Sequence, residues 1–130
     1  MLIRSSLLLV GLALLSAAPL HATPQARCRS AVPWQEAHEV AGMVAEVKGP
    51  VVSTRYARSR AGRPTFLDLG RAYPDPQRVT VVVSGRNRGR FGLPEFRYRG
   101  RMICAIGRVA LVRGVAHLEV TTPSQIRVVK

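Results

Sequence analysis

Apolar and polar residues alternate with a period of two through most of the chain after residue 43. Successive side chains of a strand point to opposite faces, so this period predicts half-buried strands. In the segment 115–122, for example, alanine, leucine and valine alternate with His117 and Glu119. The pattern predicts five strands and a last extended piece. We expect the strands from residue 43 to a loop at 55–63, and at 64–70, 78–84, 101–112 and 115–122, with the last piece at 126–129.

The segment 32–42 has a different, helical spacing of apolar residues. Trp34 and Ala37 recur on one face, Pro33 suits the first turn, and Gly42 fits the position just after the last turn. We expect a short helix here, with Trp34 as a packing residue.

Five short strands with a bend in the first are typical of an OB-fold, a small Greek-key β-barrel. Gly49-Pro50 predicts the bend. The insertion 85–100 between the third and fourth strands is expected to hold a short helix or a loop, with Phe91, Phe96 and Tyr98 plugging the barrel. A β-sandwich is the alternative, although five strands are few for it.

The first 22 residues have the pattern of a secretory signal peptide. Arg4 supplies the positive end, 7–15 an apolar stretch and 16–22 small residues, so cleavage is expected after Ala22. An uncleaved membrane anchor is the alternative. We therefore expect one OB-fold domain at 23–130, located in the periplasm or secreted, with no membrane span after cleavage.

Two cysteines, Cys28 and Cys104, remain in the predicted mature chain. Outside the cytosol such a pair can form a disulfide, which would fasten the N-terminal arm to the barrel. Two free thiols are the alternative. The spacings of these cysteines to His38 and His117 match no metal site, so we expect neither a metal nor a cofactor.

The charge balance narrows the choice of partner. Eighteen arginines face two lysines and seven acidic residues, the formal net charge is +13 and the pI is about 11.6. The guanidinium group binds phosphate through two parallel hydrogen bonds and stacks on flat rings, which lysine does not. This bias favours nucleic acid or another polyanion as partner, although a GC-rich genome also enriches arginine.

Several short motifs carry a resemblance to a known group of proteins. They include Pro33-Trp34-x-Glu36-Ala37, Val47-x-Gly49-x-Val51-Val52, Thr65-Phe66-Leu67-Asp68-Leu69-Gly70 and Pro123-Ser124-Gln125-Ile126. With them the chain resembles small OB-fold modules of bacterial secreted proteins, some of which accompany extracellular nuclease domains. The resemblance implies an OB-fold and nucleic-acid binding. No nuclease domain stands beside the module in this sequence.

In OB-folds the ligand usually lies across strands two and three, between the loops that join strands one to two and four to five. Basic residues of this chain fall on those segments, and aromatic residues near them could stack on bases. The candidate nucleic-acid-binding residues are Arg55, Tyr56, Arg58, Arg60, Arg63, Phe66, Arg71, Tyr73, Arg78 and Arg113. The alternative is a solvated basic face with the rings used for packing.

Two further features bear on this site. Phe66 and Asp68 are two residues apart in the second strand, so their side chains lie on the same face. If Asp68 points to solvent, Phe66 therefore faces the ligand and Leu67 faces the core. A second basic group either joins the first or lies on the far side of the barrel. It comprises Arg86, Arg88, Arg90, Arg97, Arg99 and Arg101.

The sequence carries no catalytic motif of the GxSxG, HExxH, Walker or GxGxxG type. Asp68 and Asp75 are separated by a proline-containing loop and do not form a metal dyad. We therefore expect a non-enzymatic OB-fold module that binds single-stranded nucleic acid or its backbone outside the cytoplasm. The alternative is a periplasmic module for envelope stress that binds a protein or an anionic polymer.

Overall fold

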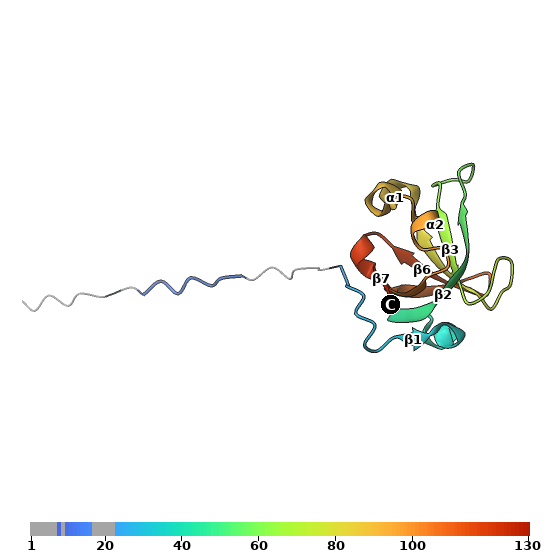
Figure 1. The fold of residues 1–130 in the computed structure, drawn as a ribbon. Coiled ribbons are helices and arrows are strands. Elements are labelled where there is room, and N and C mark those ends of the chain that lie inside the picture. The colour runs from blue at the N-terminus through green and yellow to red at the C-terminus, as the bar shows by residue number, and fades with distance from the viewer. Residues whose placement is uncertain (1–7, 9, 17–22) are drawn as a thin grey trace, which may run out of the picture.

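The computed structural model describes residues 8, 10–16 and 23–130, and its centre is a closed β-barrel (Figure 1). The barrel strands are β2 (Val44–Tyr56), β3 (Thr65–Leu69), β4 (Val79–Val83), β5 (Met102–Val112) and β6 (Val115–Val120). They pair in the order β2-β3-β4-β6-β5, and β5 pairs back with β2. The β4–β6 pair is parallel and the others are antiparallel. This is the five-stranded OB-fold that the sequence predicts.

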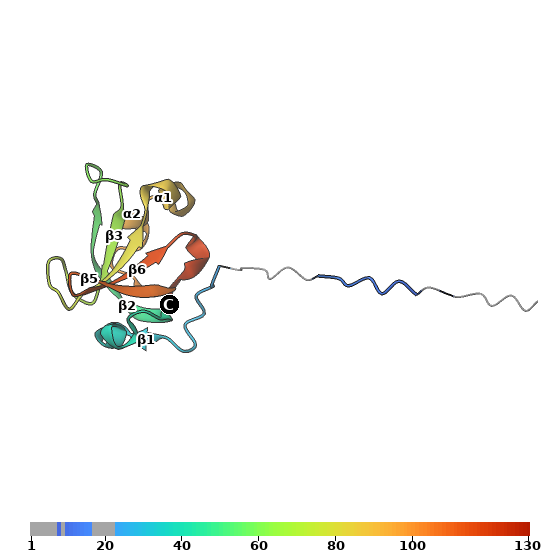
Figure 2. The same ribbon diagram turned by 180° about the vertical axis from the view of Figure 1, so that it is seen from behind.

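Short elements surround the barrel. They are β1 (Val32–Pro33), the 3₁₀ helix η1 (Trp34–Val40), α1 (Gly85–Phe91), α2 (Pro94–Arg97), the 3₁₀ turn η2 (Pro123–Gln125) and β7 (Ile126–Val128). β1 pairs with β2 and β7 pairs with β5. In both side views β1 and η1 lie at the bottom of the barrel and α1 at the top (Figures 1 and 2). The predicted N-terminal helix is present as η1, although residues 32–33, expected within it, form β1. The insertion, expected to hold a short helix or a loop, holds two short helices.

β2 is the longest strand and serves two neighbours in turn. It pairs with β5 as far as Pro50 and with β3 from Val51 onward, with a register shift between Val51 and Ser53. β2 therefore changes partner at the bend predicted at Gly49-Pro50, and the register shift follows immediately after this bend. Arg55 and Tyr56, expected in a loop, belong to β2 because they pair with residues of β3.

The core is formed by the inner faces of the barrel strands and is closed by the insertion. Leu67, Val81 and Leu118 have no exposed surface, and Phe91 and Tyr98 are each 1% exposed. The prediction that Phe96 also plugs the barrel is wrong, because its side chain is 65% exposed. It lies on the outside of α2, where the Cζ atom of Arg99 stands 5.6 Å from its ring centroid.

Trp34 closes the bottom of the barrel, as its predicted packing role requires. Its half-buried ring packs against the core and lies directly over Gly70. A Cβ atom at Gly70 would come within 2.1 Å of a Trp34 ring carbon, and φ at this position is +77°. Glycine is the residue that satisfies both conditions.

A disulfide joins Cys28 to Cys104, with an S–S distance of 2.10 Å. The backbone N–H of Cys28 also donates to the Glu46 carboxylate. Cys104 lies in β5, so these two contacts fix the N-terminal arm to the barrel. Within the described ranges, the same three residues are the one cluster of potential metal ligands, and the disulfide occupies both sulfurs.

The predicted signal peptide lies mostly outside the described residues, including its expected cleavage site at Ala22. The described part, residues 8 and 10–16, has no secondary structure and lies away from the barrel (Figure 1). Among the described segments, none of the helices has the length and apolar character needed to cross a membrane.

Candidate nucleic-acid interface

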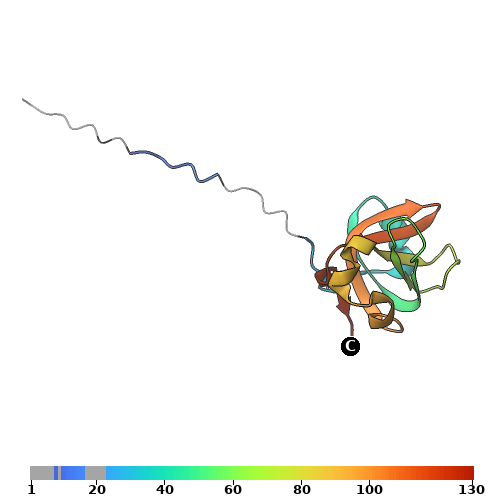
Figure 3. The same ribbon diagram turned by 90° about the horizontal axis from the view of Figure 1, so that it is seen from above.

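A groove of about 890 Å³ crosses the outer surface of the barrel. Three connections border it: the first loop (57–64, between β2 and β3), the proline loop (70–78, between β3 and β4) and the last hairpin (113–114, between β5 and β6). The proline loop projects from the side opposite the N-terminal tail, and the first loop rises at the top of the barrel (Figures 1 and 3). This is the surface on which OB-folds usually hold their ligands.

Eight of the residues predicted from the sequence line this groove. They are Arg55, Tyr56, Arg58, Arg60, Phe66, Tyr73, Arg78 and Arg113. The other two, Arg63 and Arg71, are exposed but do not line it. The first loop turns at Gly62, whose carbonyl accepts a 2.8 Å hydrogen bond from the N–H of Gly85, and so Arg63 lies toward α1.

One of the groove arginines is already neutralised. Arg78 is 9% exposed, forms an ion pair with Asp68 at 3.4 Å, and donates to the carbonyl of Asp75 at 2.8 Å. Asp68 also accepts hydrogen bonds of 2.8 Å from Ser53 and from Thr80. The condition that Asp68 points to solvent is therefore not met: the residue is 3% exposed because these partners and the proline loop cover it.

The other groove arginines keep their charge available. In the part of the chain that the structure describes, no carboxylate forms an ion pair with Arg55, Arg58, Arg60 or Arg113. All four side chains are exposed. The groove therefore offers four uncompensated guanidinium groups to a ligand.

Three aromatic rings lie among these arginines. Leu67 is fully buried in the core, and its neighbour Phe66 lines the groove with only 7% exposure. Tyr73 in the proline loop is 54% exposed, and Tyr56 at the end of β2 is half-buried. The alternation within β3 thus places Phe66 on the groove side even though Asp68 is covered.

The two basic groups meet at Tyr56. The Cζ atom of Arg88 in α1 lies 3.8 Å from the Tyr56 ring centroid, and the same guanidinium pairs with Glu95. Arg99 donates to the hydroxyl oxygen of Thr54 in β2 at 2.8 Å and 3.1 Å. Part of the second basic group therefore lies next to the end of β2, but neither Arg88 nor Arg99 lines the groove.

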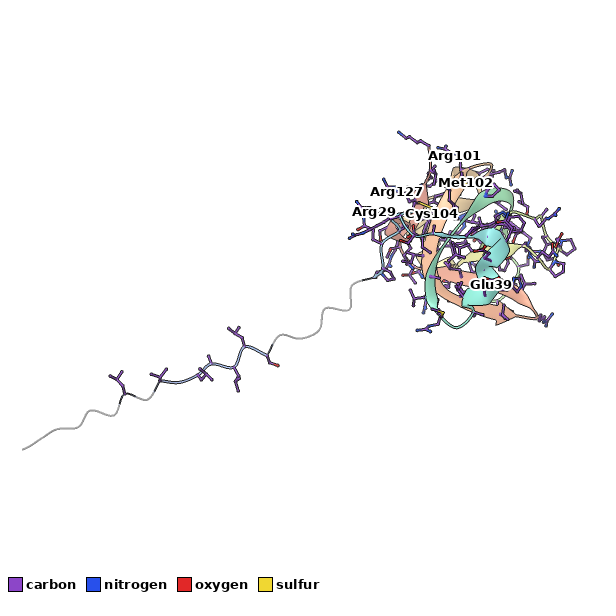
Figure 4. All side chains as sticks on the ribbon, turned by 90° about the horizontal axis from the view of Figure 1, so that it is seen from below. Arg29, Glu39, Arg101, Met102, Cys104 and Arg127 are labelled. Atoms are coloured by element: carbon purple, nitrogen blue, oxygen red, sulfur yellow. A yellow bond between two sulfur atoms is a disulfide. The ribbon has the colours of Figure 1, made fainter. Side chains whose placement is uncertain are left out.

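Other basic residues lie elsewhere. Arg29, Arg101 and Arg127 are found together on the tail side of the barrel, away from the proline loop (Figure 4). A second depression of about 480 Å³, which we call the distal cleft, includes Arg27, Arg127 and Lys130. None of the described residues that line the distal cleft is aromatic.

His117 also lines the groove, although no motif in the sequence indicates a binding role for it. It lies in β6 opposite Thr80 of β4. Burial lowers the pKa of its imidazole, the Arg78 and Arg60 charges lower it further, and Asp68 partly opposes them. The parallel β4–β6 pairing brings His117 to the groove, and no local pattern in the sequence reveals that pairing.

Comparisons with known proteins support the architecture. No protein-family model matches the chain, and neither does any curated protein sequence. The chain is similar in structure to asparaginyl-tRNA synthetase from Pyrococcus horikoshii, with a TM-score of 0.53, 21% identity, and coverage of 78% of this chain and 23% of that chain. It is also similar to a protein assigned as an aspartyl-tRNA synthetase from Leishmania major Friedlin, with a TM-score of 0.50, 18% identity, and coverage of 88% and 23%. The chain thus corresponds to a small part of each synthetase, and at this identity the similarity establishes the fold alone.

Proposed function

We propose that this chain is a non-catalytic OB-fold module that binds nucleic acid along its groove. The observation that carries the proposal is the convergence of four uncompensated guanidinium groups on the surface where OB-folds hold ligands. A row of fixed cations suits a phosphate backbone, because binding releases the counterions condensed on it. The two synthetases similar in fold are named for tRNA, a nucleic acid.

The groove supports binding better than catalysis. Both oxygens of Asp68 are engaged, one by Ser53 and the other by Thr80 and Arg78. His117 lines the groove among arginines, and the partners that hold the Asp68 carboxylate are Ser53, Thr80 and Arg78 rather than His117. Binding without chemistry is therefore our proposal for this surface.

A location outside the cytoplasm completes the proposal. Disulfides persist in oxidising compartments, and Cys28 is joined to Cys104. The signal-peptide pattern of residues 1–22 points the same way.

The test compares two triple variants with the same change of net charge. Arg58→Gln, Arg60→Gln and Arg113→Gln remove three charges from the groove, while Arg29→Gln, Arg101→Gln and Arg127→Gln remove three from the tail side. Fluorescence anisotropy with a labelled single-stranded oligonucleotide measures the affinity at near-physiological salt. We expect the groove triple to weaken binding more than about tenfold and the matched triple to change it little. Equal losses would show attraction to net charge only, and no binding by the unmodified protein would reject the function.

A further inference from the structure

The groove differs from an ordinary base-stacking platform in one respect: arginines of the same chain already lie over each of its rings. The Cζ atoms of Arg55 and Arg60 lie over Phe66, 4.9 Å and 5.6 Å from the ring centroid. Arg55 and Arg78 lie over Tyr73, at 4.3 Å and 4.9 Å. Arg58 and Arg88 lie over the third ring, Tyr56, at 5.7 Å and 3.8 Å.

The contacts link these residues into one series. Arg60 lies over Phe66, Arg55 lies over both Phe66 and Tyr73, and Arg78 lies over Tyr73. We call these five residues the arginine ladder. The ion pair between Arg78 and Asp68 fixes one end of the ladder. The other end, Arg60, lies in the first loop and is exposed.

The ladder leaves little of the Phe66 ring for a base, and Tyr73, although 54% exposed, has Arg55 and Arg78 over its ring. Phe66 is 7% exposed, so a base could reach it only by displacing Arg55 or Arg60. A cation–π contact and a base–ring contact are of similar strength, and such an exchange would therefore gain little. Displaced arginines would also lose the positions in which they face the ligand.

The ladder does leave the edges of the guanidinium groups free. Stacking uses the flat face of guanidinium, whereas its five N–H donors point outward in the plane. A stacked arginine can therefore hold a ring and bind a phosphate at the same time. Because Tyr73 and Phe66 already restrict the rotamers of Arg55, less side-chain entropy is lost when a phosphate binds.

We infer that the groove recognises the phosphodiester backbone of nucleic acid and not its bases, with the rings positioning the arginines. This inference rests on the proposed function and specifies its ligand chemistry. It predicts binding without base preference, and it assigns Tyr73 as a residue that positions Arg55.

The experiment compares two single strands of about 16 nucleotides, one with bases and one abasic throughout, in the same buffer. We expect their Kd values to agree within about fivefold, since stacking of even one base contributes at least about that factor. An abasic strand that binds more weakly than this would overturn the inference and leave the proposed function standing. Binding of neither strand would reject the proposed function itself.

A variant of the exposed ring gives a second readout. Tyr73→Leu removes the ring without changing charge, and we expect the same loss of affinity for both strands. Phe96→Leu is the matched control, because Phe96 is also exposed and stacked by an arginine but lies outside the groove. A loss confined to the base-bearing strand, or no loss for either strand, would contradict the positioning role of Tyr73.

Discussion

The steepness with which salt weakens oligonucleotide binding is expected to report the number of groove arginines that meet phosphates. Among the residues that the structure describes, four guanidinium groups line the groove without a carboxylate partner, since Arg78 is paired with Asp68. Each phosphate contact on a single strand contributes about −0.7 to the slope of log K against log salt, so the expected slope is about −2.8. Between about 50 mM and about 200 mM salt, the affinity should then fall by roughly 50-fold.

Substitution of an arginine should change this slope only if that arginine lies in the groove and has no carboxylate partner. Arg60→Gln removes one uncompensated charge, and the slope should become about −2.1. Arg127→Gln, on the tail side, should leave it unchanged. The double variant Arg78→Gln/Asp68→Asn removes an ion pair with no change of net charge, and it should also keep the slope of the original protein.

The assay is a series of anisotropy titrations at four or more salt concentrations, with circular dichroism to check that each variant is folded. A slope near zero for the unmodified protein would show that phosphates are not the ligand. Equal changes for Arg60→Gln and Arg127→Gln would show that overall charge, and not the groove, determines binding.

Three further predictions concern stability. The pKa of His117 in the folded protein lies below its ordinary value. As pH drops through about 6.5, His117 is therefore protonated in the unfolded chain before it is protonated in the folded protein, and the free energy of unfolding should fall. Urea titrations of His117→Gln should lack that part of the pH dependence. Gly70→Ala should lower stability by about 2 kcal/mol in thermal unfolding, because its Cβ would collide with the Trp34 ring. Replacing Cys28 and Cys104 by alanine should cost about 4 kcal/mol in urea, because the disulfide closes a loop across a separation of 76 residues.

The barrel could be predicted because its signals are local. Period-two alternation identifies a strand within a few residues. In β6, for example, His117 and Glu119 alternate with the buried residues Ala116, Leu118 and Val120. The order of strands then follows from the number of elements and the OB-fold pattern. The end of β2 was missed because pairing of Arg55 with Phe66 extends the strand into a segment with loop-like composition.

The sequence predicts the site residues well only where a single loop carries them to the groove. Their position in the first loop identifies Arg58 and Arg60 correctly. The same argument also selects Arg63, which the turn at Gly62 directs toward α1. The neutralisation of Arg78 depends on Asp68, ten positions earlier in the chain, and on the β3–β4 pairing between them. Such contacts are set by tertiary structure and leave no mark in local composition.

The arginine ladder, more than the number of cations, distinguishes the groove from the rest of this basic surface. The distal cleft also gathers cations, Arg27, Arg127 and Lys130, but no ring restrains them. A free arginine loses rotamer entropy when it binds a phosphate, whereas Arg55, held between Phe66 and Tyr73, has lost much of it on folding. Loss of the Tyr73 ring should therefore weaken binding by the same factor at every salt concentration and leave the slope unchanged. Loss of a charge changes the slope itself, so the two kinds of variant separate the positioning of the arginines from their electrostatic contribution.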